Sequence, residues 1–414
     1  MRSKMYRFCC LLAMLQVSLV WAASAQAQSN SFFNRRKRIV IPFETYNNLI
    51  VVPVKINGSE TLNFILDTGA GMTLLTDPKA IRFLQLPFVR TLNIGGMGEG
   101  ESLLTSVSVN NEVFMGSSQA RLHNILALEE DVLALSSYIG APVHGILGCD
   151  FFHAFVVEIN FMRKEICLYQ PEHYKEPRKG VTYPLTLENQ KPHTYIDLLV
   201  DGAPVTIKVL LDTGAGHALL LDANSIAPLQ LPEKRLRMEL GRGLSGIIKG
   251  HLGRVEGMRI GGSELDEVLT SFPDTNSVAL AAYRNSGRQG NVGCEVLNRF
   301  KVTFNFPKRY VHFKPYRSRI NKPFERDMSG LELRAIGEQF DRVVVSSVIP
   351  GSAADRAGLV PDDEIVLVDA MPAAAMKLSE IYKNFQRKSG RKVHLLVRRG
   401  DEFYMVPLQL RRLI

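Results

Sequence analysis

The sequence predicts a mainly β protein with two related lobes in tandem, followed by a smaller α/β domain. Three observations predict this fold. One block of residues recurs at a fixed spacing, short β-branched runs broken by turn residues fill both copies, and a helical pattern appears only near the C-terminus. Of the 414 residues, 46% are hydrophobic and 22% are charged. This composition excludes collagen-like and disordered chains.

The chain begins with the features of a secretory signal. An apolar stretch, residues 8–23, follows three basic residues and ends in Ala25-Gln26-Ala27, a small-x-small cleavage site. We therefore expect residues 1–27 to be a signal peptide and the mature chain to be exported. No later segment has the roughly 20 consecutive apolar residues that a membrane-spanning helix needs, so no transmembrane segment is expected.

Charge and cysteine content narrow the function classes. Beyond the signal three cysteines remain, an odd number without a C-x-x-C pair, so we expect no disulfide framework, no metal site and no cofactor. The formal charge falls from +9 to +6, because the signal carries three basic residues and no acidic one. Residues 28–38 contain the run Arg35-Arg36-Lys37-Arg38 and are interpreted as a solvated basic arm. An anionic envelope surface could attract this arm, whereas an exported chain without a recognition motif is not expected to bind nucleic acid.

A duplicated domain organises the chain. The block Phe64-Ile-Leu-Asp67-Thr-Gly-Ala-Gly71 recurs 145 residues later as Val209-Leu-Leu-Asp212-Thr-Gly-Ala-Gly216, and a second block, Gly145–Asp150, recurs at the same spacing as Gly290–Glu295. Two blocks that share one offset indicate an internal repeat. The two copies are placed at residues 39–175 and 180–316.

Each copy is expected to be built mainly of strands. The predicted strands, separated by Asn-Gly or Asp-Gly turns, are residues 39–43, 49–56 and 61–66 in the first copy and 195–200 and 205–211 in the second. Two glycine clusters, residues 95–100 and 241–246, are interpreted as hairpin tips. Neither cluster forms the G-x-G-x-x-G pattern before a helix that a dinucleotide site requires.

The third domain is placed at residues 328–414, after a charged linker at 317–327. Its expected strands are residues 331–335, 342–348, 363–368, 393–398 and 403–410. Apolar residues at 378, 381, 382 and 385 have the spacing of one helix face and predict a short helix over 378–385.

The repeat has a chemical consequence. Duplicated domains tend to pair about an approximate two-fold axis, which brings matching residues face to face. Asp67 and Asp212 would then meet and share one proton, because two adjacent carboxylates cannot both ionise cheaply. One carboxylate could activate a water while its protonated partner donates to a carbonyl oxygen, which is general acid–base hydrolysis. Neither H-E-x-x-H nor G-x-S-x-G occurs, which argues against metallo- and serine hydrolases.

These blocks resemble the aspartic proteases, in particular bacterial retropepsin-like enzymes with two lobes in one chain and a C-terminal PDZ domain. D-T-G-A is the retroviral-type form of the motif, and the second family element, two hydrophobic residues and a glycine, stands as Ile146-Leu147-Gly148 and, less perfectly, as Asn291-Val292-Gly293. The resemblance implies two retropepsin-like β-barrel lobes packed as a pseudo-two-fold, bilobal acid protease. Asn291 departs from the pattern, and this departure bears on the local packing of the second lobe and not on the dyad.

The resemblance assigns roles residue by residue. It implies a catalytic dyad of Asp67 and Asp212, supported by Thr68, Gly69, Thr213 and Gly214, whose threonine hydroxyls would grip the two lobes together. It also implies a flap that closes over the substrate, formed by Gly95, Gly96, Met97 and Gly98.

The third domain resembles the PDZ domains of bacterial envelope proteases. The matching segments are Pro350-Gly-Ser-Ala-Ala, Ala357-Gly358-Leu359 and Asp363-Glu364-Ile365-Val366. Such domains add an extended peptide to a sheet edge and hold its terminal carboxylate with backbone amides. The resemblance implies a C-terminal peptide ligand. Its binding residues would be Gly330, Leu331, Glu332 and Leu333, facing the helix at Leu378.

Several other residues have simpler interpretations. Cys149 and Cys294 occupy matching repeat positions and are expected to be small buried residues near the axis. His217 could line a substrate subsite, but a packed or solvent-facing histidine is the preferred interpretation. Asp77 and Asp222 also match and are expected to cap a turn or helix start.

Ala70 and Ala215 stand where pepsins place a hydroxyl that can hydrogen-bond an ionised aspartate. Because alanine cannot do so, we expect raised pKa values for the dyad and activity at mildly acidic to near-neutral pH.

Together these features predict an exported aspartic endopeptidase of the periplasm or cell surface of a Gram-negative bacterium. It would cut peptides or unfolded protein segments, with the PDZ domain recruiting or gating the substrate. The alternatives are an inactive peptide-binding scaffold and a zymogen-like envelope protein.

Overall fold

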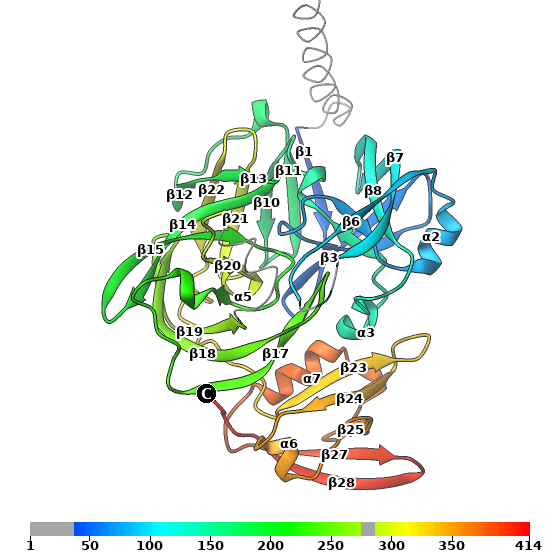
Figure 1. Ribbon diagram of the computed structural model, residues 1–414, viewed down its shortest axis with the longest axis vertical. Helices are drawn as coiled ribbons and strands as arrows, with labels where there is room; N and C mark the ends of the chain where they lie inside the picture. The colour runs from blue at the N-terminus through cyan, green and yellow to red at the C-terminus, as the bar shows by residue number, and fades with distance from the viewer. Residues whose placement is uncertain (1–36, 99, 101, 275–285) are drawn as a thin grey trace, which may run out of the picture.

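The computed structural model describes residues 37–98, 100, 102–274 and 286–414. The predicted signal peptide and all but the last two residues of the basic arm lie outside this part of the chain. The fold is mainly β. Figure 1 shows lobe 1 in blue and cyan beside lobe 2 in green and yellow, with the C-terminal domain in orange and red below both.

Each lobe contains an eight-stranded sheet, and the two sheets have the same strand order. In lobe 1 the order is β2-β3-β4-β9-β5-β8-β7-β6, with bounds β2 Glu44–Tyr46, β3 Leu49–Ile56, β4 Leu62–Leu66, β5 Thr73–Leu75, β6 Phe88–Ile94, β7 Leu103–Met115, β8 Ser118–Leu128 and β9 Gly145–Leu147. In lobe 2 the order is β13-β14-β15-β20-β16-β19-β18-β17, with bounds β13 Thr186–Glu188, β14 Lys191–Val200, β15 Ala203–Leu211, β16 Leu219–Leu221, β17 Arg235–Gly243, β18 Gly246–Ile260, β19 Ser263–Pro273 and β20 Gly290–Val292. This correspondence is the structural form of the sequence repeat.

The strands that lead to the D-T-G-A-G blocks are buried because both of their faces are covered. β4 ends in the buried run Phe64-Ile65-Leu66, and β15 ends in the buried run Val209-Leu210-Leu211. Each pairs in parallel with a three-residue strand, with Leu66 opposite Leu147 in β9 and Leu211 opposite Val292 in β20. Continuous apolar runs are typical of such parallel, two-sided strands.

A third sheet joins the lobes. Its order is β1-β11-β10-β21-β22-β12, with bounds β1 Arg38–Pro42, β10 Val156–Asn160, β11 Glu165–Tyr169, β12 Val181–Pro184, β21 Phe300–Asn305 and β22 Tyr310–Pro315. The lobes meet where β10 runs antiparallel to β21. In β1 the alternation of exposed residues with buried Ile39 and Ile41 places one face on the shared core.

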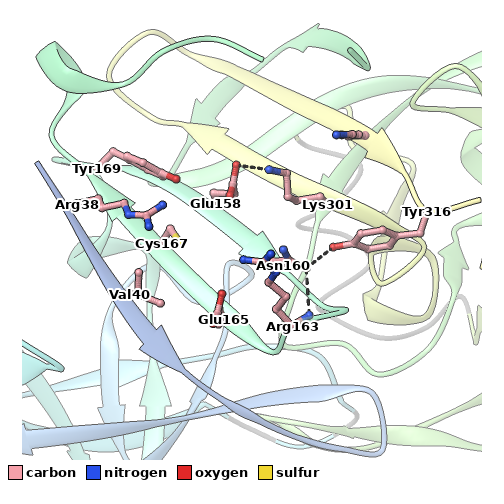
Figure 2. A pocket seen from close by; sticks show the side chains of 11 residues that line it. Arg38, Val40, Glu158, Asn160, Arg163, Glu165, Cys167, Tyr169, Lys301 and Tyr316 are labelled. Carbon is pink, nitrogen blue, oxygen red and sulfur yellow. Dashed lines mark hydrogen bonds and ion pairs between the residues drawn. The ribbon is translucent and has the colours of Figure 1, made fainter. Parts of the chain in front are cut away.

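The other face of this joining sheet carries a polar depression of about 590 Å³, shown in Figure 2. Glu158 in β10 and Lys301 in β21 form an ion pair across it at 2.7 Å, and the Tyr316 hydroxyl donates to Asn160 at 2.9 Å. Its lining residues include none of the D-T-G-A-G residues, so the depression is distinct from the predicted catalytic site.

Within the described ranges, the helices are short and lie outside the sheets. They are α2 Pro78–Leu84, α3 Leu135–Ile139 and α5 Cys294–Leu297 in the lobes, and α6 Ala353–Arg356 and α7 Leu378–Phe385 in the C-terminal domain. The 3₁₀-helices are η2 Cys149–Phe151, η3 Pro171–His173, η4 Ala223–Ser225 and η5 Ala373–Ala375. None of the helices in the described ranges has the length and hydrophobicity needed to span a membrane.

The C-terminal domain has a sheet of order β23-β24-β25-β27-β28, with β26 paired to β25. The bounds are β23 Leu331–Ile336, β24 Arg342–Val348, β25 Glu364–Val368, β26 Met371–Pro372, β27 Lys392–Arg399 and β28 Glu402–Gln409. The predicted helix over 378–385 is confirmed as α7, and its buried residues Leu378, Ile381 and Phe385 pack into this domain's own core.

The C-terminal domain is docked on the lobes rather than tethered apart from them. Phe324 in the linker and Ile414 at the chain end are buried in the core that the two lobes share. Lys377 pairs with Glu44 of lobe 1 at 2.7 Å. Gly140, just after α3, lies between β23 and α7, because a Cβ there would be 3.5 Å from Ala335 Cβ and 3.0 Å from Leu378 Cβ. In Figure 1, α3 and β17 both face this domain.

Candidate active site

The two aspartates leave matching strand ends and meet between the lobes. Asp67 follows β4 and its backbone NH donates to Leu147 O at 3.0 Å, while Asp212 follows β15 and donates to Val292 O at 2.9 Å. Since the parallel strands hold both loops in the same way, the repeat places the two carboxyl groups on opposite sides of the pseudo-two-fold axis.

The neighbouring threonines bind the two loops to each other. Thr68 Oγ1 donates to Leu211 O at 2.6 Å and accepts from Thr213 NH at 2.9 Å. Thr213 Oγ1 makes the matching bonds. It donates to Leu66 O at 2.9 Å and accepts from Thr68 NH at 3.0 Å. Both threonines are buried, so this symmetric set of four bonds fixes the separation of the loops that carry the aspartates.

The glycines that follow the threonines leave room for the opposite carboxyl group. A Cβ on Gly69 would stand 2.7 Å from Asp212 Oδ1, and a Cβ on Gly214 would overlap the Asp67 carboxyl group. Each glycine also donates its NH to the aspartate of its own loop, Gly69 to Asp67 Oδ1 at 2.6 Å and Gly214 to Asp212 Oδ1 at 3.0 Å. The close approach of the two aspartates therefore depends on glycine at both positions.

Burial and the neighbouring carboxyl group dominate the electrostatics of Asp67. Burial, followed by the negative charge of Asp212, raises the pKa of Asp67 to about 7. A hydrogen bond between the two carboxyl groups also raises it, while the Gly69 NH and the charge of Lys191 act against the shift. Asp67 therefore holds a proton at mildly acidic pH, as two carboxyl groups that share a site require.

Asn291 adds a contact to the second aspartate alone. Its Nδ2 donates to Asp212 Oδ2 at 2.9 Å, and Asn291 is 4% exposed within β20. The interpretation that this departure bears on packing and not on the dyad is therefore corrected, because Asn291 contacts Asp212 directly. Its amide faces the dyad because the parallel pairing of β15 with β20 brings the two residues together, which the sequence pattern alone does not show.

Two hairpin tips, one from each lobe, meet each other. The first lies between β6 and β7 and contains the predicted flap residues Gly95, Gly96, Met97 and Gly98. The second, between β17 and β18, was expected only as a hairpin. Ser245 at its tip donates its NH to Met97 O at 3.0 Å and accepts from Gly100 NH at 2.5 Å. The matching glycine clusters were the signal for this second flap.

Each flap tip also packs on the opposite lobe. Leu244 of the second flap contacts an apolar cluster of lobe 1 that includes Leu74 and Ile146, and Met97 of the first flap packs on Leu220 of lobe 2. Gly98, with φ of +131°, lies against the Ser245 backbone where a side chain would not fit. The tips therefore interlock.

Comparison with known families agrees with this geometry. Residues 52–151 match the family described as aspartyl protease, and residues 317–398 match the PDZ domain family. The chain carries an aspartyl protease domain and a PDZ domain. The protease match covers Asp67 and the predicted flap residues, and lobe 2 repeats the same strand order around Asp212. No curated protein matches the chain.

Other residues near the protease dyad are structural. Cys149 and Cys294 are buried and donate their thiols to Thr68 O and Thr213 O, each at 3.3 Å. His217 is packed, and its buried Nε2 has no hydrogen-bond partner among the residues that the structure describes. These positions fit the interpretation of small or packed residues near the axis.

The two matching aspartates behave differently as caps. Asp77 caps α2 by accepting from Lys79 NH at 2.8 Å. Asp222 stands at the start of η4, but its side chain makes no capping hydrogen bond, so that part of the expectation was wrong.

The predicted peptide-binding residues of the PDZ domain lie in and just before its edge strand, β23. Gly330 NH donates to Asp327 Oδ2 at 2.9 Å, and the neighbouring Ser329 NH donates to Asp327 Oδ1 at 3.1 Å. Leu333 NH donates to the Tyr382 hydroxyl of α7 at 2.7 Å. Leu331 is buried. The chain itself thus occupies amides that an added peptide would use.

Glu332, the remaining predicted groove residue, pairs with Arg326 of the linker at 2.6 Å. Within the described ranges, no three His, Cys, Asp or Glu side chains are grouped as metal ligands would be.

Proposed function

We propose that this protein is an exported aspartic endopeptidase that hydrolyses peptide bonds with the dyad Asp67 and Asp212. The observation that carries the proposal is the pair of aspartates held face to face by the Thr68–Thr213 grip, with the pKa of Asp67 raised to about 7. Peptide binding alone has no need of two acids on one axis.

The dyad supports hydrolysis with an activated water. Ionised Asp212 accepts a proton from a water molecule while the water oxygen attacks the peptide carbonyl carbon. Protonated Asp67 donates its proton to the carbonyl oxygen. The resulting gem-diol collapses as a proton passes to the amide nitrogen and the C–N bond breaks. The reaction leaves one proton on the dyad, as at the start.

The proposed substrates are extended peptides or unfolded protein segments. Their backbone would lie between the dyad and the two flaps, whose tips meet at Met97 and Ser245. The cluster beneath the flaps, which includes Leu74, Val107 and Leu126, is apolar and suits apolar side chains beside the scissile bond.

The contacts between the PDZ domain and the protease lobes support a role for the PDZ domain in gating the protease. Its groove between β23 and α7 meets Gly140 of lobe 1, and Asp327 occupies the Gly330 amide. Arg326 contacts both Glu332 of the PDZ domain and the Met238 side chain of β17, the second flap strand. We infer that the docked domain restrains this flap, and that recruitment of a C-terminal peptide would require undocking.

Export to the periplasm or surface of a Gram-negative bacterium is part of the proposal. It is supported by the basic and apolar N-terminal stretch and the Ala25-Gln26-Ala27 site. Cleavage after Ala27 of the secreted protein, read by N-terminal sequencing, is the expected result.

The test of the proposed activity uses residues 28–414 with casein and an unstructured peptide library. We expect turnover that Asp67→Asn and Asp212→Asn each abolish, with both variants folded by circular dichroism. Turnover that persists in both variants would come from a contaminant. Peptide binding without any turnover in the unmodified protein would establish the scaffold instead.

A further inference from the structure

The two lobes differ in the side chains that stand behind the aspartates. At the repeat spacing, Ile146 in β9 is matched by Asn291 in β20, and Val143 is matched by Arg288. Arg288 is 7% exposed and Asn291 is 4% exposed. Two buried polar side chains therefore lie behind Asp212, where the first lobe has two aliphatic ones behind Asp67.

The orientation of the Asn291 amide is fixed by its neighbour. Arg288 Nη2 donates to Asn291 Oδ1, and Arg288 Nε donates to Gly290 O at 3.3 Å. A guanidinium group has donors and no acceptor, so the Asn291 atom that faces it must be the carbonyl oxygen. The NH₂ group then points to Asp212 Oδ2, where it can only donate.

This donor makes the hydrogen bonding of the dyad asymmetric. Asp212 accepts at both oxygens, from Gly214 NH on Oδ1 and from Asn291 on Oδ2. The two backbone donors to Asp67, from Gly69 and Ala70, both reach Oδ1. Ile146 cannot supply the matching bond, and hydrogen bonds to a carboxylate favour its ionised form.

We propose that Asn291, oriented by Arg288, is a positioning residue that sets the roles of the two aspartates, keeping Asp212 ionised as the base and leaving the proton on Asp67 as the acid. The inference rests on the proposed hydrolytic function and deepens it. In a symmetric dyad the proton would reside equally on either aspartate. For water attack from one side of the peptide, half of the molecules would then carry the proton on the aspartate that must act as the base.

Other charged and titratable groups around the dyad do not produce this difference. Those that interact electrostatically with Asp67 or Asp212 or with their neighbours are Lys191, His217, Arg288, Asp150, Cys149 and Cys294, of which Asp150 acts on Cys149. Burial lowers the pKa of His217 and raises those of the two thiols, so all three are neutral near pH 7. Lys191 lowers the pKa of Asp67 and so opposes the asymmetry that Asn291 creates.

The first test is the pH profile of kcat/KM for Asn291→Ile, which copies the lobe 1 residue. Loss of a hydrogen bond to a charged group is expected to move the acidic limb upward by about one pH unit. Arg288→Met should move it in the same direction by less, and Arg288→Lys, which keeps a donor for the Asn291 carbonyl, should restore the wild-type limb. Ile146→Val is the matched control and leaves the limb in place.

The second test does not depend on turnover. In protein labelled with ¹³C at the aspartate carboxyl carbons, the signals lost in Asp67→Asn and in Asp212→Asn identify the two carboxyl groups, and the Asp67 signal should titrate near neutral pH. Asn291→Ile should bring the two midpoints closer. If the unmodified protein hydrolyses nothing, the proposed function fails while this titration still decides the inference. Unchanged midpoints and an unchanged acidic limb, with only a lower melting temperature, would overturn it.

Discussion

At the residue scale, the dyad depends on a few side chains that the sequence identifies well and on others that it does not. Asp67 and Asp212 are recognisable because each sits in a repeated motif, and the motif dictates the backbone turn that aims the carboxyl group. The amide of Asn291 is not recognisable in this way. Its role arises from the parallel pairing of two segments 79 residues apart, and such proximity has no local signal in a single sequence.

The raised pKa of Asp67 makes stability depend on pH with a definite sign. In the native state Asp67 keeps its proton up to about pH 7, while in the unfolded chain it ionises near the ordinary aspartate pKa of 3.8. Between these values the native state binds more protons, so its contribution to stability falls as pH rises. Asp67→Asn should therefore gain stability relative to wild type, on the order of 1–4 kcal/mol, from pH 4 to pH 7.

The measurement for this prediction is urea unfolding of both proteins at several pH values. Other buried groups, such as Glu295 with its raised pKa and His193 with its lowered pKa, titrate in both proteins and cancel in the difference. Parallel stability curves for wild type and Asp67→Asn would show that Asp67 ionises at an ordinary pH.

At the element scale, most strands follow from local pattern. β3, β24 and α7 begin and end at the predicted residues, because alternation or helical spacing within each segment decides which face is buried. The pairing of the two flap tips could not be predicted in this way. It depends on backbone groups of Met97 and Ser245 that are brought together only when both lobes are folded.

Leu244 tests whether the interlocked flaps matter for catalysis. Leu244→Ser removes its apolar contact with the lobe 1 cluster, so the closed arrangement over the dyad should be less populated. We expect kcat/KM to fall roughly 10- to 100-fold, because misplacing a substrate by about 1 Å has an effect of that size.

The control for this flap variant is Leu104→Ser, in strand β7 that follows the first flap, where Leu104 is 59% exposed. It should leave kcat/KM unchanged. Equal kcat/KM for Leu244→Ser and wild type would mean that the tip contact plays no part in turnover.

At the scale of the whole molecule, the position of the PDZ domain is the feature that the sequence predicts least. Its strands and helix were expected, but its docking is not encoded in any local pattern. It arises from contacts between distant segments, such as Lys377 with Glu44 and the burial of Ile414 in the shared core.

Ala335 tests the proposed gate. It is buried in β23 and lies next to Gly140 of lobe 1, so Ala335→Arg would force the two surfaces apart. Release of the second flap should raise kcat/KM for a short peptide several-fold and speed hydrogen exchange in β17.

Phe403→Arg, an exposed site in β28 at the far edge of the PDZ sheet, is the matched control and should change neither property. If Ala335→Arg also leaves kcat/KM and exchange in β17 unchanged, the docked domain does not restrain the flap.

The covalent linkage of the two lobes has a consequence for how such a molecule can change over time. In an assembly of two identical subunits, every mutation appears on both sides of the cleft. A hydrogen-bond donor placed behind one aspartate would therefore also stand behind the other. Here one gene encodes both halves at separate positions, so Ile146 and Asn291 were free to diverge. Two equivalent aspartates can take different roles only when separate codons encode the two halves, because a substitution behind one aspartate is then not repeated behind the other.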